Sequence, residues 1–256
     1  MMNIKGKIVF ITGASSGIGM ESAKAFAKEG CKLILTARRI DRIKILAAEL
    51  LKEFGTESLT LPLDVRKKEE VFTLFEKLPN DWKKIDILLN NAGVGKGLSP
   101  LHDSDPEGWD EMIDTNVKGL LFITKSVSNL MIKNGSGHII NVGSVAGREV
   151  YPNGNVYCAT KFAVNALTKA MRVELYDKNI RVTTVDPGMV ETEFSLVRFD
   201  GDEERAKNVY KGMTPLSPAD IADTIIFCAT RPAHVNISEV VIYPSDQANT
   251  TTVKRS

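Results

Sequence analysis

The sequence predicts an α/β fold in which one parallel sheet carries helices on both faces. Short apolar runs rich in Ile, Val and Leu alternate with longer segments of helical periodicity along the chain. Strands that are apolar throughout are typical of sheets covered on both faces, and strand–helix alternation implies right-handed crossovers between parallel strands. No Gly/Pro-rich linker and no internal repeat interrupts the pattern, so we expect a single domain over residues 1–256.

The elements can be placed in chain order. The runs predicted to be strands are 7–12, 31–36, 58–63, 85–90, 137–142, 180–185 and 239–244. The segments predicted to be helices are 17–29, 39–54, 67–78, 107–132, 154–177 and 218–230. The polar, irregular stretch at about 188–216 follows the sixth strand, where an insertion would form a lid over a bound ligand. The polar terminal segment TTVKRS is expected to fray.

The composition excludes several classes of function. The chain has 256 residues, of which 33 are basic and 32 acidic, and its net charge of +1 predicts no nucleic-acid or membrane partner. The absence of a long apolar run and of a signal sequence predicts a cytoplasmic protein. The three cysteines are far apart and the three histidines are scattered, so we expect reduced thiols and no metal site.

A glycine-rich turn follows the first predicted strand. Gly13, Gly17 and Gly19 punctuate the segment TGASSGIG, directly before a helix. Glycine allows a phosphate to approach the backbone, and the free N–H groups at a helix start suit a pyrophosphate. The spacing differs from the common G-x-G-x-x-G fingerprint, and three glycines also occur in ordinary turns, but the position after the first strand favours a dinucleotide site. Its predicted contacts also include Ser15, Ser16 and Ile18.

Two arginines follow the second predicted strand, where an NAD site normally has an acidic residue for the ribose 2′-hydroxyl. The segment is LILTARRIDR, so Arg38 and Arg39 occupy this position, and Asp41 lies too far along the chain. Guanidinium groups match a 2′-phosphate, with charge-assisted hydrogen bonds of about 1.5–3 kcal/mol each. We therefore expect NADP rather than NAD. The alternative is a basic start to a solvated helix, with Asp41 as the ion-pair partner.

The ends of the third and fourth predicted strands supply further candidates. Asp64 could accept a hydrogen bond from an adenine amino group while the Val65 N–H meets the ring, or it could cap the helix that follows. The small residues around Asn91, Ala92 and Gly93 would let the backbone pass close to a flat ligand, or they could form an ordinary turn.

Taken together, the motifs TGASSGIG, NNAG, DTNVKG, YCATK and DPGMVET resemble those of the short-chain dehydrogenase/reductase family. They occur in the family's order and cover nearly the whole chain. The resemblance implies a Rossmann-like, doubly wound, seven-stranded sheet, a nicotinamide cofactor and a catalytic set of Ser144, Tyr157, Lys161 and Asn116. It also implies that the DPGMVET segment holds the nicotinamide end, through Pro187, Gly188, Val190 and Thr192.

The chemistry that the resemblance implies sets a demand on Tyr157. This residue would give its proton to the carbonyl in reduction and take the hydroxyl proton in oxidation, while Ser144 bonds the same oxygen. Acting near pH 7 requires a pKa about 3 units below the ordinary value, or about 4 kcal/mol, which an exposed lysine does not supply. Lys161, four residues on, must therefore be desolvated with it; it would also hold the nicotinamide ribose, and Asn116 would position a water. The alternative is a solvent-facing pair on an amphipathic helix.

A narrower resemblance concerns the substrate. The segments SVAGREVYPNGNVYCATKFAV, TEFSLVRFDGDEERAKNVYKGMTPLSPADIAD and PAHVNI look like those of NADP-dependent 3-hydroxy acid dehydrogenases, which act on serine, allo-threonine and 3-hydroxyisobutyrate. A carboxylate substrate needs a cation, and Arg148 and Arg198 are the candidates. Arg148 could instead be a loop-surface residue, and Arg198 could pair with Glu191 or Asp200. The alternative functions are a reductase of another carbonyl and a non-catalytic NADP-binding sensor.

Two predicted helices have apolar residues on more than one face, which indicates burial on more than one side. They are the segments 107–132 and 154–177. One face of each can meet the sheet, and another can meet a second copy of the chain. Since the family usually forms tetramers, we expect a homotetramer built on these two helices.

Overall fold

All seven predicted strands form one parallel sheet in the computed structural model, which describes residues 2–256. The order across the sheet is β3-β2-β1-β4-β5-β6-β7, so the direction of the crossovers reverses between β1 and β4. The prediction of a doubly wound α/β sheet is confirmed. The strands are β1 (Ile8–Thr12), β2 (Lys32–Ala37), β3 (Ser58–Pro62), β4 (Ile85–Asn90), β5 (Gly137–Val142), β6 (Ile180–Pro187) and β7 (Glu239–Ile242).

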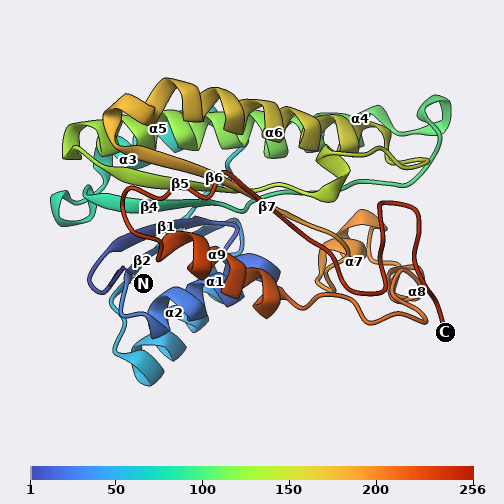
Figure 1. Cartoon of the computed structure of the whole chain (residues 1–256), viewed down its shortest axis with the longest axis horizontal. Helices are drawn as coiled ribbons and strands as arrows, with labels where there is room; N and C mark the ends of the chain where they lie inside the picture. The colour runs from blue at the N-terminus through green and yellow to red at the C-terminus, as the bar shows by residue number, and fades with distance from the viewer. Residues whose placement is uncertain (1) are drawn as a thin grey trace.

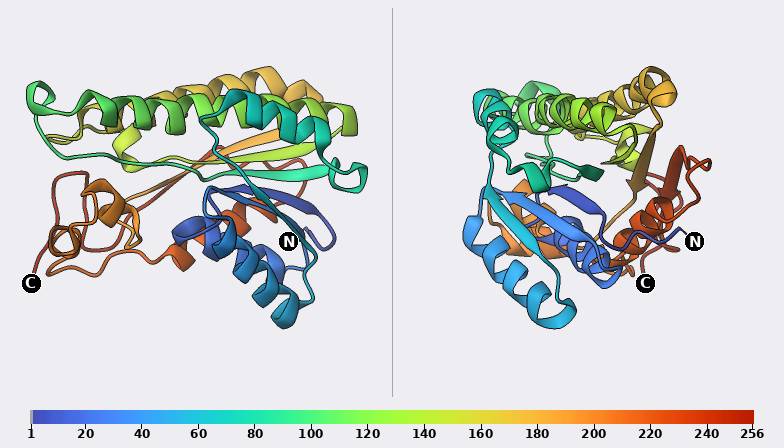
Figure 2. Two further views of the ribbon diagram at one scale, coloured as in Figure 1. Left: turned by 180° about the vertical axis from the view of Figure 1, so that it is seen from behind. Right: turned by 90° about the vertical axis from the view of Figure 1, so that its left-hand side faces the viewer.

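The helices form a layer on each face of the sheet (Figure 1; Figure 2). α3, α5 and α6 lie on one face, and α1, α2 and α9 lie on the other. The helices are α1 (Gly17–Lys28), α2 (Ile40–Phe54), α3 (Lys68–Lys77), α4 (Pro106–Ile113), α5 (Leu120–Asn134), α6 (Asn155–Leu175), α7 (Phe194–Arg198), α8 (Glu203–Asn208) and α9 (Pro218–Ala229). Across residues 2–256, none of them has both the length and the apolar character needed to cross a membrane.

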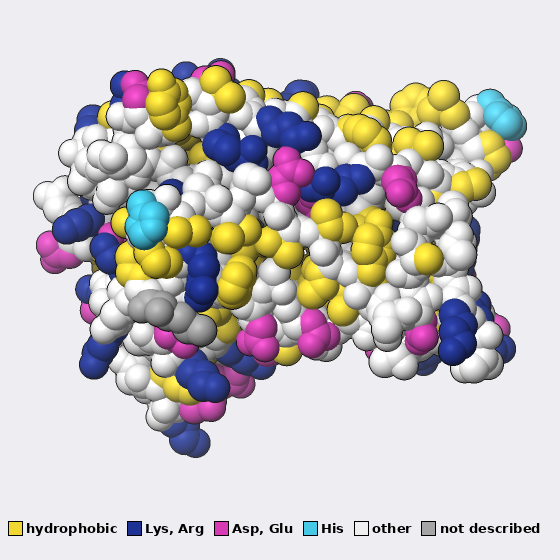
Figure 3. Space-filling model, in the orientation of Figure 1, with side chains coloured by type: hydrophobic (Ala, Val, Ile, Leu, Met, Phe, Trp, Pro, Cys, Tyr) yellow, Lys and Arg dark blue, Asp and Glu magenta, His cyan; other side chains and the backbone are white. Residues whose placement is uncertain are grey.

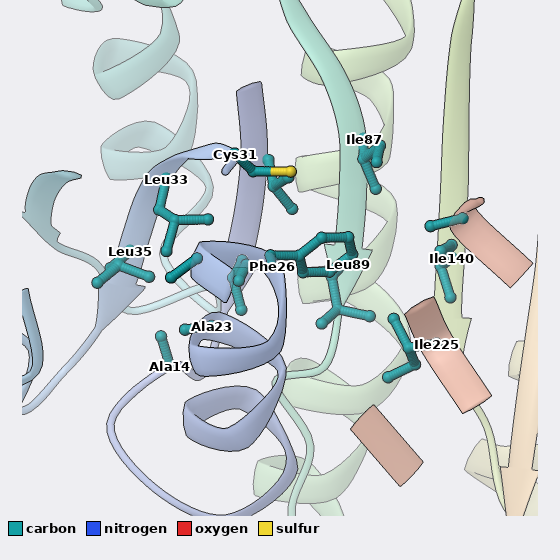
Figure 4. Packing of buried hydrophobic residues seen from close by; sticks show 14 of the residues in the cluster. Ala14, Ala23, Phe26, Cys31, Leu33, Leu35, Ile87, Leu89, Ile140 and Ile225 are labelled. Carbon is teal, nitrogen blue, oxygen red and sulfur yellow. The ribbon is translucent and has the colours of Figure 1, made fainter. Parts of the chain in front are cut away.

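Alternate residues of the central strands pack into the two helical layers. In β1, Val9 and Ile11 belong to the core under α1 and α9, whereas Phe10 packs against Phe75 of α3 with ring centroids 5.1 Å apart. Figure 4 shows Phe26 of α1 among the side chains of neighbouring strands. Burying a side chain of this size contributes about 1.5–3 kcal/mol. Because both faces of the strands are covered in this way, the strands are recognisable in the sequence as continuous apolar runs.

The single helix predicted over 107–132 is divided in the structure. Between α4 and α5 lies a π-helical turn, Asp114–Gly119. Within this turn Asn116 is buried, and its side-chain amide bonds both backbone groups of Val94. Single π-helical turns are frequent at functional sites. An apolar pattern read over so long a window tolerates one extra residue, so it does not reveal the turn.

The end of the chain packs against the segment 188–216, which contains the short helices α7 and α8 (Figure 1). Gln247 and Val253 form a bridge, the Ser256 N–H donates to the Gly212 carbonyl at 2.9 Å, and the Arg255 guanidinium donates to the Val209 carbonyl at 3.0 Å. The expectation of a frayed terminus is therefore wrong. The carbonyls that follow α8 need donors, and the tail supplies them.

A buried histidine joins β5 to β6. His138 Nδ1 accepts a hydrogen bond from Arg181 Nη2 at 3.2 Å, because a guanidinium can only donate. Nε2 therefore carries the proton and donates to Thr183 Oγ1 at 2.8 Å, and the hydroxyl of Thr183 donates to the Ile237 carbonyl. Burial, reinforced by the charge of Arg181, lowers the pKa of His138 to about 3.

We expect the free energy of unfolding to fall as the pH drops from about 6.5 towards 3, because the unfolded chain then binds a proton that the folded protein excludes at His138. The contribution is present above pH 6.5 and declines by up to about 1.4 kcal/mol per pH unit below it. Urea unfolding at several pH values measures the slope. His138→Gln should show a shallower slope than the native protein, and a change at the exposed His234, His234→Gln, should not. Identical slopes in the two variants would contradict the conclusion that His138 is neutral in the folded protein.

Candidate functional site

The carboxyl ends of the central strands open into a cavity of about 510 Å³. It lies where the crossover direction reverses between β1 and β4, the position at which doubly wound sheets bind ligands. The predicted site residues that line it are Gly13, Ser15, Ser16, Gly17, Ile18, Arg38, Arg39, Asp64, Val65, Asn91, Ala92, Gly93, Ser144, Tyr157, Lys161, Pro187, Gly188, Val190, Thr192 and Arg198. Gly19, Asn116 and Arg148 do not line it.

The glycine-rich turn needs its glycines for two reasons. Gly13 and Gly17 have φ angles of +68° and +54°, which favour glycine. A Cβ on Gly19 would collide with the carbonyl oxygen of Gly13, so a side chain there would open the turn. Asn91, predicted as a ligand contact, donates from Nδ2 to the Thr12 and Gly13 carbonyls and so ties the turn to the end of β4. Gly19 therefore shapes the wall of the cavity from behind it.

The two arginines after β2 have different partners. Arg38 is about half exposed, and its guanidinium lies 3.5 Å from the carboxylate of Glu111. Arg39 donates to the hydroxyls of Ser15 and Ser16 and, at 2.8 Å, to the carboxylate of Glu193.

No sequence motif indicated Glu193, which comes from the segment 188–216. Its second oxygen accepts a hydrogen bond from Arg42 at 2.7 Å. Burial would raise the pKa of Glu193, but the hydrogen bonds from Arg42 and Arg39 outweigh it and hold that pKa below its usual value. An anion is therefore already held on Arg39 at the cavity wall, and it is Glu193 rather than Asp41 that pairs with the basic cluster.

Asp64 lines the cavity but does not cap a helix. Its carboxylate accepts two hydrogen bonds from the Arg66 guanidinium, at 2.9 and 2.6 Å, and α3 begins only at Lys68. Burial would raise the pKa of Asp64, but the hydrogen bonds from Arg66 keep it below its usual value. The capping alternative is excluded, and the carboxylate stays ionised at the cavity wall.

Tyr157 and Lys161 are not a solvent-facing pair. Lys161 is buried, its Nζ donates to the Val142 carbonyl at 3.0 Å, and it lies 5.9 Å from the centroid of the Tyr157 ring. Burial lowers the pKa of Lys161 to about 8, although the nearby carboxylate of Asp186 opposes the shift. The amine therefore lines the cavity, and near pH 8 only part of the protein molecules carry it in the protonated form.

The groups of the protein itself raise the pKa of the Tyr157 hydroxyl, and the lowered pKa that the chemistry requires stays a prediction. Burial of the Tyr157 hydroxyl raises its pKa, and the charge of Arg198 and a hydrogen bond with Ser144 offset only part of this. The physical reason is that the phenolate would lose its water, while the amine of Lys161, 5.9 Å from the ring centroid, bonds the Val142 carbonyl. Ser144 also accepts a hydrogen bond from the Ala146 N–H, which leaves its own proton to donate.

The side chain of Asn116 is fully engaged within the protein. Its Oδ1 accepts from the Val94 N–H at 2.8 Å, and its Nδ2 donates to the Val94 carbonyl at 2.8 Å and to Thr160 Oγ1 at 3.0 Å. That Asn116 positions a water stays a prediction, and these three bonds show what its side chain does. It joins the π-helical turn to the loop after β4 and to α6.

Arg148 lies outside the cavity, which corrects the expectation that it could bind a substrate. Its Nε donates to the carboxylate of Asp186 at 2.7 Å and its Nη2 to that of Glu239 at 2.6 Å. Asp186 is fully buried, and an unpaired charge there would cost several kcal/mol. The guanidinium is therefore committed to holding this carboxylate.

Arg198, by contrast, lies in the cavity wall. Its Nη2 donates to the Tyr151 hydroxyl at 2.9 Å. Asp200, considered as its partner, pairs with Lys96 at 2.8 Å instead, and within residues 2–256 no carboxylate forms an ion pair with Arg198. Tyr151 is thereby part of the cavity wall. Further lining residues that no motif indicated include Phe194, Tyr210, Gln247 and Thr250.

Comparison with known proteins shows which proteins this chain resembles. The family model described as short chain dehydrogenase matches residues 7–202. The NADP-dependent 3-hydroxy acid dehydrogenase of Schizosaccharomyces pombe is 44% identical over 256 residues, which cover 100% of this chain and 99% of that protein. Sulfoacetaldehyde reductase 2 of Chromohalobacter salexigens is 43% identical over 242 residues, covering 94% of this chain and 95% of that protein.

Among solved structures, the closed form of serine dehydrogenase complexed with NADP⁺ superposes with a TM-score of 0.90. It is 40% identical and covers 97% of this chain and 100% of that one. The family model, the sequence identity over the whole chain and the superposition agree: the chain belongs to the short chain dehydrogenase family.

Proposed function

We propose that the protein is an NADP-dependent dehydrogenase that interconverts 3-hydroxy acids and 3-oxo acids. The observation that carries the proposal is Arg198, a cation without a carboxylate partner within residues 2–256, in the same cavity as Tyr157 and Lys161. A substrate carboxylate would supply that partner while its hydroxyl faces Tyr157. The names of the fungal relative and of the serine dehydrogenase support the same class, since serine is itself a 3-hydroxy acid.

The residues at the other end of the cavity fit NADP. The crowded turn around Gly13 and Gly17, at the start of α1, suits a pyrophosphate, and Arg38 and Arg39 suit a 2′-phosphate. The carboxylate of Glu193 on Arg39 supports an anion-binding role for this point. When bound, NADP(H) accepts or supplies the hydride. Asp64, Val65 and the NNAG segment would meet the adenosine part, and the DPGMVET segment the nicotinamide end.

The proton chemistry falls to the side chains around Tyr157. Its hydroxyl would give a proton to the carbonyl oxygen during reduction and take one from the substrate hydroxyl during oxidation. Ser144 would donate a hydrogen bond to the same oxygen through its hydroxyl proton, while its own oxygen accepts from the Ala146 N–H. Lys161 would keep a positive charge near the site, and Asp186 supports that charge.

A sulfonate substrate is the second candidate. The relative from Chromohalobacter salexigens is named a sulfoacetaldehyde reductase, and it is about as similar as the hydroxy acid dehydrogenases. A 2-hydroxyethanesulfonate carries its acid group as many atoms from the reacting carbon as a 3-hydroxypropionate does. The same cation could therefore serve either acid group.

The segment 188–216 would act as the lid over the substrate. It contributes Thr192, Phe194 and Arg198 to the cavity wall, and Tyr210 holds its fold by donating to the Val190 carbonyl at 2.7 Å.

We place the protein in the cytoplasm, because its three cysteines are free and buried as reduced thiols usually are.

The substrate proposal is tested with a panel of 3-hydroxy acids, 2-hydroxyethanesulfonate and simple secondary alcohols. Arg198→Met should raise KM for the acids by about 10- to 150-fold, the equivalent of one charge-assisted interaction, and leave the alcohols nearly unchanged. The matched control is Arg205→Met, since Arg205 stacks on Phe199 outside the cavity. An equal loss on acids and alcohols would reject the role of Arg198. Tight NADPH binding without turnover on the whole panel would favour a non-catalytic sensor.

The cofactor proposal is tested by measuring the preference for NADP⁺ over NAD⁺. Arg39→Ala should weaken NADP⁺ binding by about 10- to 100-fold and NAD⁺ binding much less, because only NADP⁺ carries the 2′-phosphate. Arg42→Ala is the matched control: Arg42 bonds the same Glu193 but does not line the cavity. A similar change in preference in both variants would show that the effect runs through Glu193 rather than through the phosphate.

The proposed tetramer depends on exposed apolar side chains in the layer of α5 and α6. Phe162 and Val173 of α6 are exposed, as are Ile113 of α4 and Leu121 of α5, and Figure 3 shows hydrophobic side chains along this layer. Sedimentation should give a mass near four times 28.1 kDa. Phe162→Glu should reduce it, whereas Leu51→Glu on the distant α2 should not. A monomeric native protein at micromolar concentration would contradict the proposal.

A further inference from the structure

Arg198 lies in a cage of aromatic rings. Its Cζ is 4.8 Å from the ring centroid of Tyr157, 5.0 Å from that of Phe194 and 6.0 Å from that of Tyr151. Gly95 allows this approach, because a Cβ there would lie 2.6 Å from Phe194 and 2.9 Å from Arg198 Nε. Cations over aromatic faces within about 6 Å are attracted to them. The cage thus fixes the guanidinium beside the tyrosine that carries the proton.

The positive charge of Arg198 is not neutralised by the protein that surrounds it. Its Nε is buried and has no acceptor within residues 2–256, and its Nη2 bonds only the neutral hydroxyl of Tyr151. Asp200, two residues on, is held by Lys96. A guanidinium stays charged at every pH at which the protein is folded. Its field on Tyr157 therefore depends on whether an anion from outside is bound to it.

The other charged groups near Tyr157 lie farther from its ring or are bonded to other partners. Lys161 lies 5.9 Å from the ring centroid and donates to a backbone carbonyl, and Asp186, which acts on Lys161, is held by Arg148. Among residues 2–256, five polar or charged groups face Tyr157. They are Lys161 and Cys158 from α6, Ser144 and Tyr151 from the loop after β5, and Arg198 from α7. Tyr210, which follows α8, faces Arg198. Arg198 is the nearest cation among them.

We propose that Arg198 sets how readily Tyr157 releases its proton, and that an acid group bound to Arg198 makes Tyr157 hold that proton more tightly. The first part stands on the cage alone, and the second rests on the proposed function. Among the charges named above, Arg198 also makes the largest contribution that lowers the pKa of Tyr157. Recognition of the acid group and control of the catalytic proton are therefore linked through one guanidinium.

The consequence is a difference between acid and neutral substrates. A bound carboxylate or sulfonate compensates the charge of Arg198, so the neutral phenol is favoured when a 3-oxo acid is ready to receive a proton. A neutral alcohol or ketone leaves the charge uncompensated, and the phenolate form is favoured. Arg198 Cζ lies 4.8 Å from the centroid of the Tyr157 ring, and for charges separated by a distance of this order the compensation is worth a pKa difference of about one unit.

The test is the ionisation of Tyr157 itself, followed as the tyrosinate absorbance of the native protein minus that of Tyr157→Phe. Arg198→Met should raise the midpoint by about one pH unit or more, and Arg198→Lys, which keeps a cation, should raise it less. Propionate should raise the midpoint of the native protein, and the neutral propionamide should not. Propionate should have no effect in Arg198→Met.

An unchanged midpoint in Arg198→Met overturns the inference, whatever the substrate panel gives. If that variant does not fold, the comparison of propionate with propionamide on the native protein decides: equal midpoints overturn the link between acid binding and the proton. A raised midpoint in Arg198→Met with no turnover of 3-hydroxy acids or sulfonates would uphold the role of Arg198 at Tyr157 and reject the proposed substrate class.

Discussion

The ion pair between Arg148 and the buried carboxylate of Asp186 is the interaction on which the electrostatics of the cavity depend. Asp186 lies close enough to Lys161 to raise its pKa against the effect of burial. If this carboxylate bonded Lys161 directly, the amine would be drawn away from Tyr157. Arg148 takes the bond instead, at 2.7 Å, and Lys161 is left to the Val142 carbonyl. Gly143 must be glycine for this arrangement, because a Cβ there would collide with Asp186.

Carboxylates elsewhere around the cavity are paired with cations in the same way. Asp64 and Glu193, the carboxylates among the lining residues that the structure describes, are held by Arg66 and by Arg39 with Arg42. Asp200, two residues after Arg198, is held by Lys96. Among the lining residues that the structure describes, Lys161 and Arg198 are cations without a carboxylate partner. Both lie within 6 Å of the centroid of the Tyr157 ring, Lys161 at 5.9 Å and Arg198 at 4.8 Å. Charge balance within the protein therefore singles out the place where an anionic substrate is needed.

The fold and one end of the cavity could be predicted from the sequence because they depend on the backbone. Buried parallel strands must be apolar, and a turn such as Gly13–Gly19 needs positive φ and close approach, so both leave a pattern. The π-helical turn around Asn116 left none, since one extra residue hardly disturbs the apolar periodicity. Glu193 and the partners of Arg148 also left none, because an ion pair between distant segments has no fixed spacing.

The substrate end of the cavity depends on contacts between side chains rather than on the backbone, so it leaves no sequence pattern. Arg198, Phe194 and Tyr151 need only reach one another in space, and their positions depend on packing of the segment 188–216 against the tail. If this end of the cavity holds the acid group as proposed, substitutions there would alter which acid group is held without disturbing the glycine-rich turn or the sheet. This separation explains how relatives that share the sheet and the turn can carry different names, for hydroxy acids in one case and for sulfoacetaldehyde in another. Since Arg198 also faces Tyr157, the proposed role of Arg198 implies that a change of substrate acid group in this chain would affect the proton chemistry as well as binding.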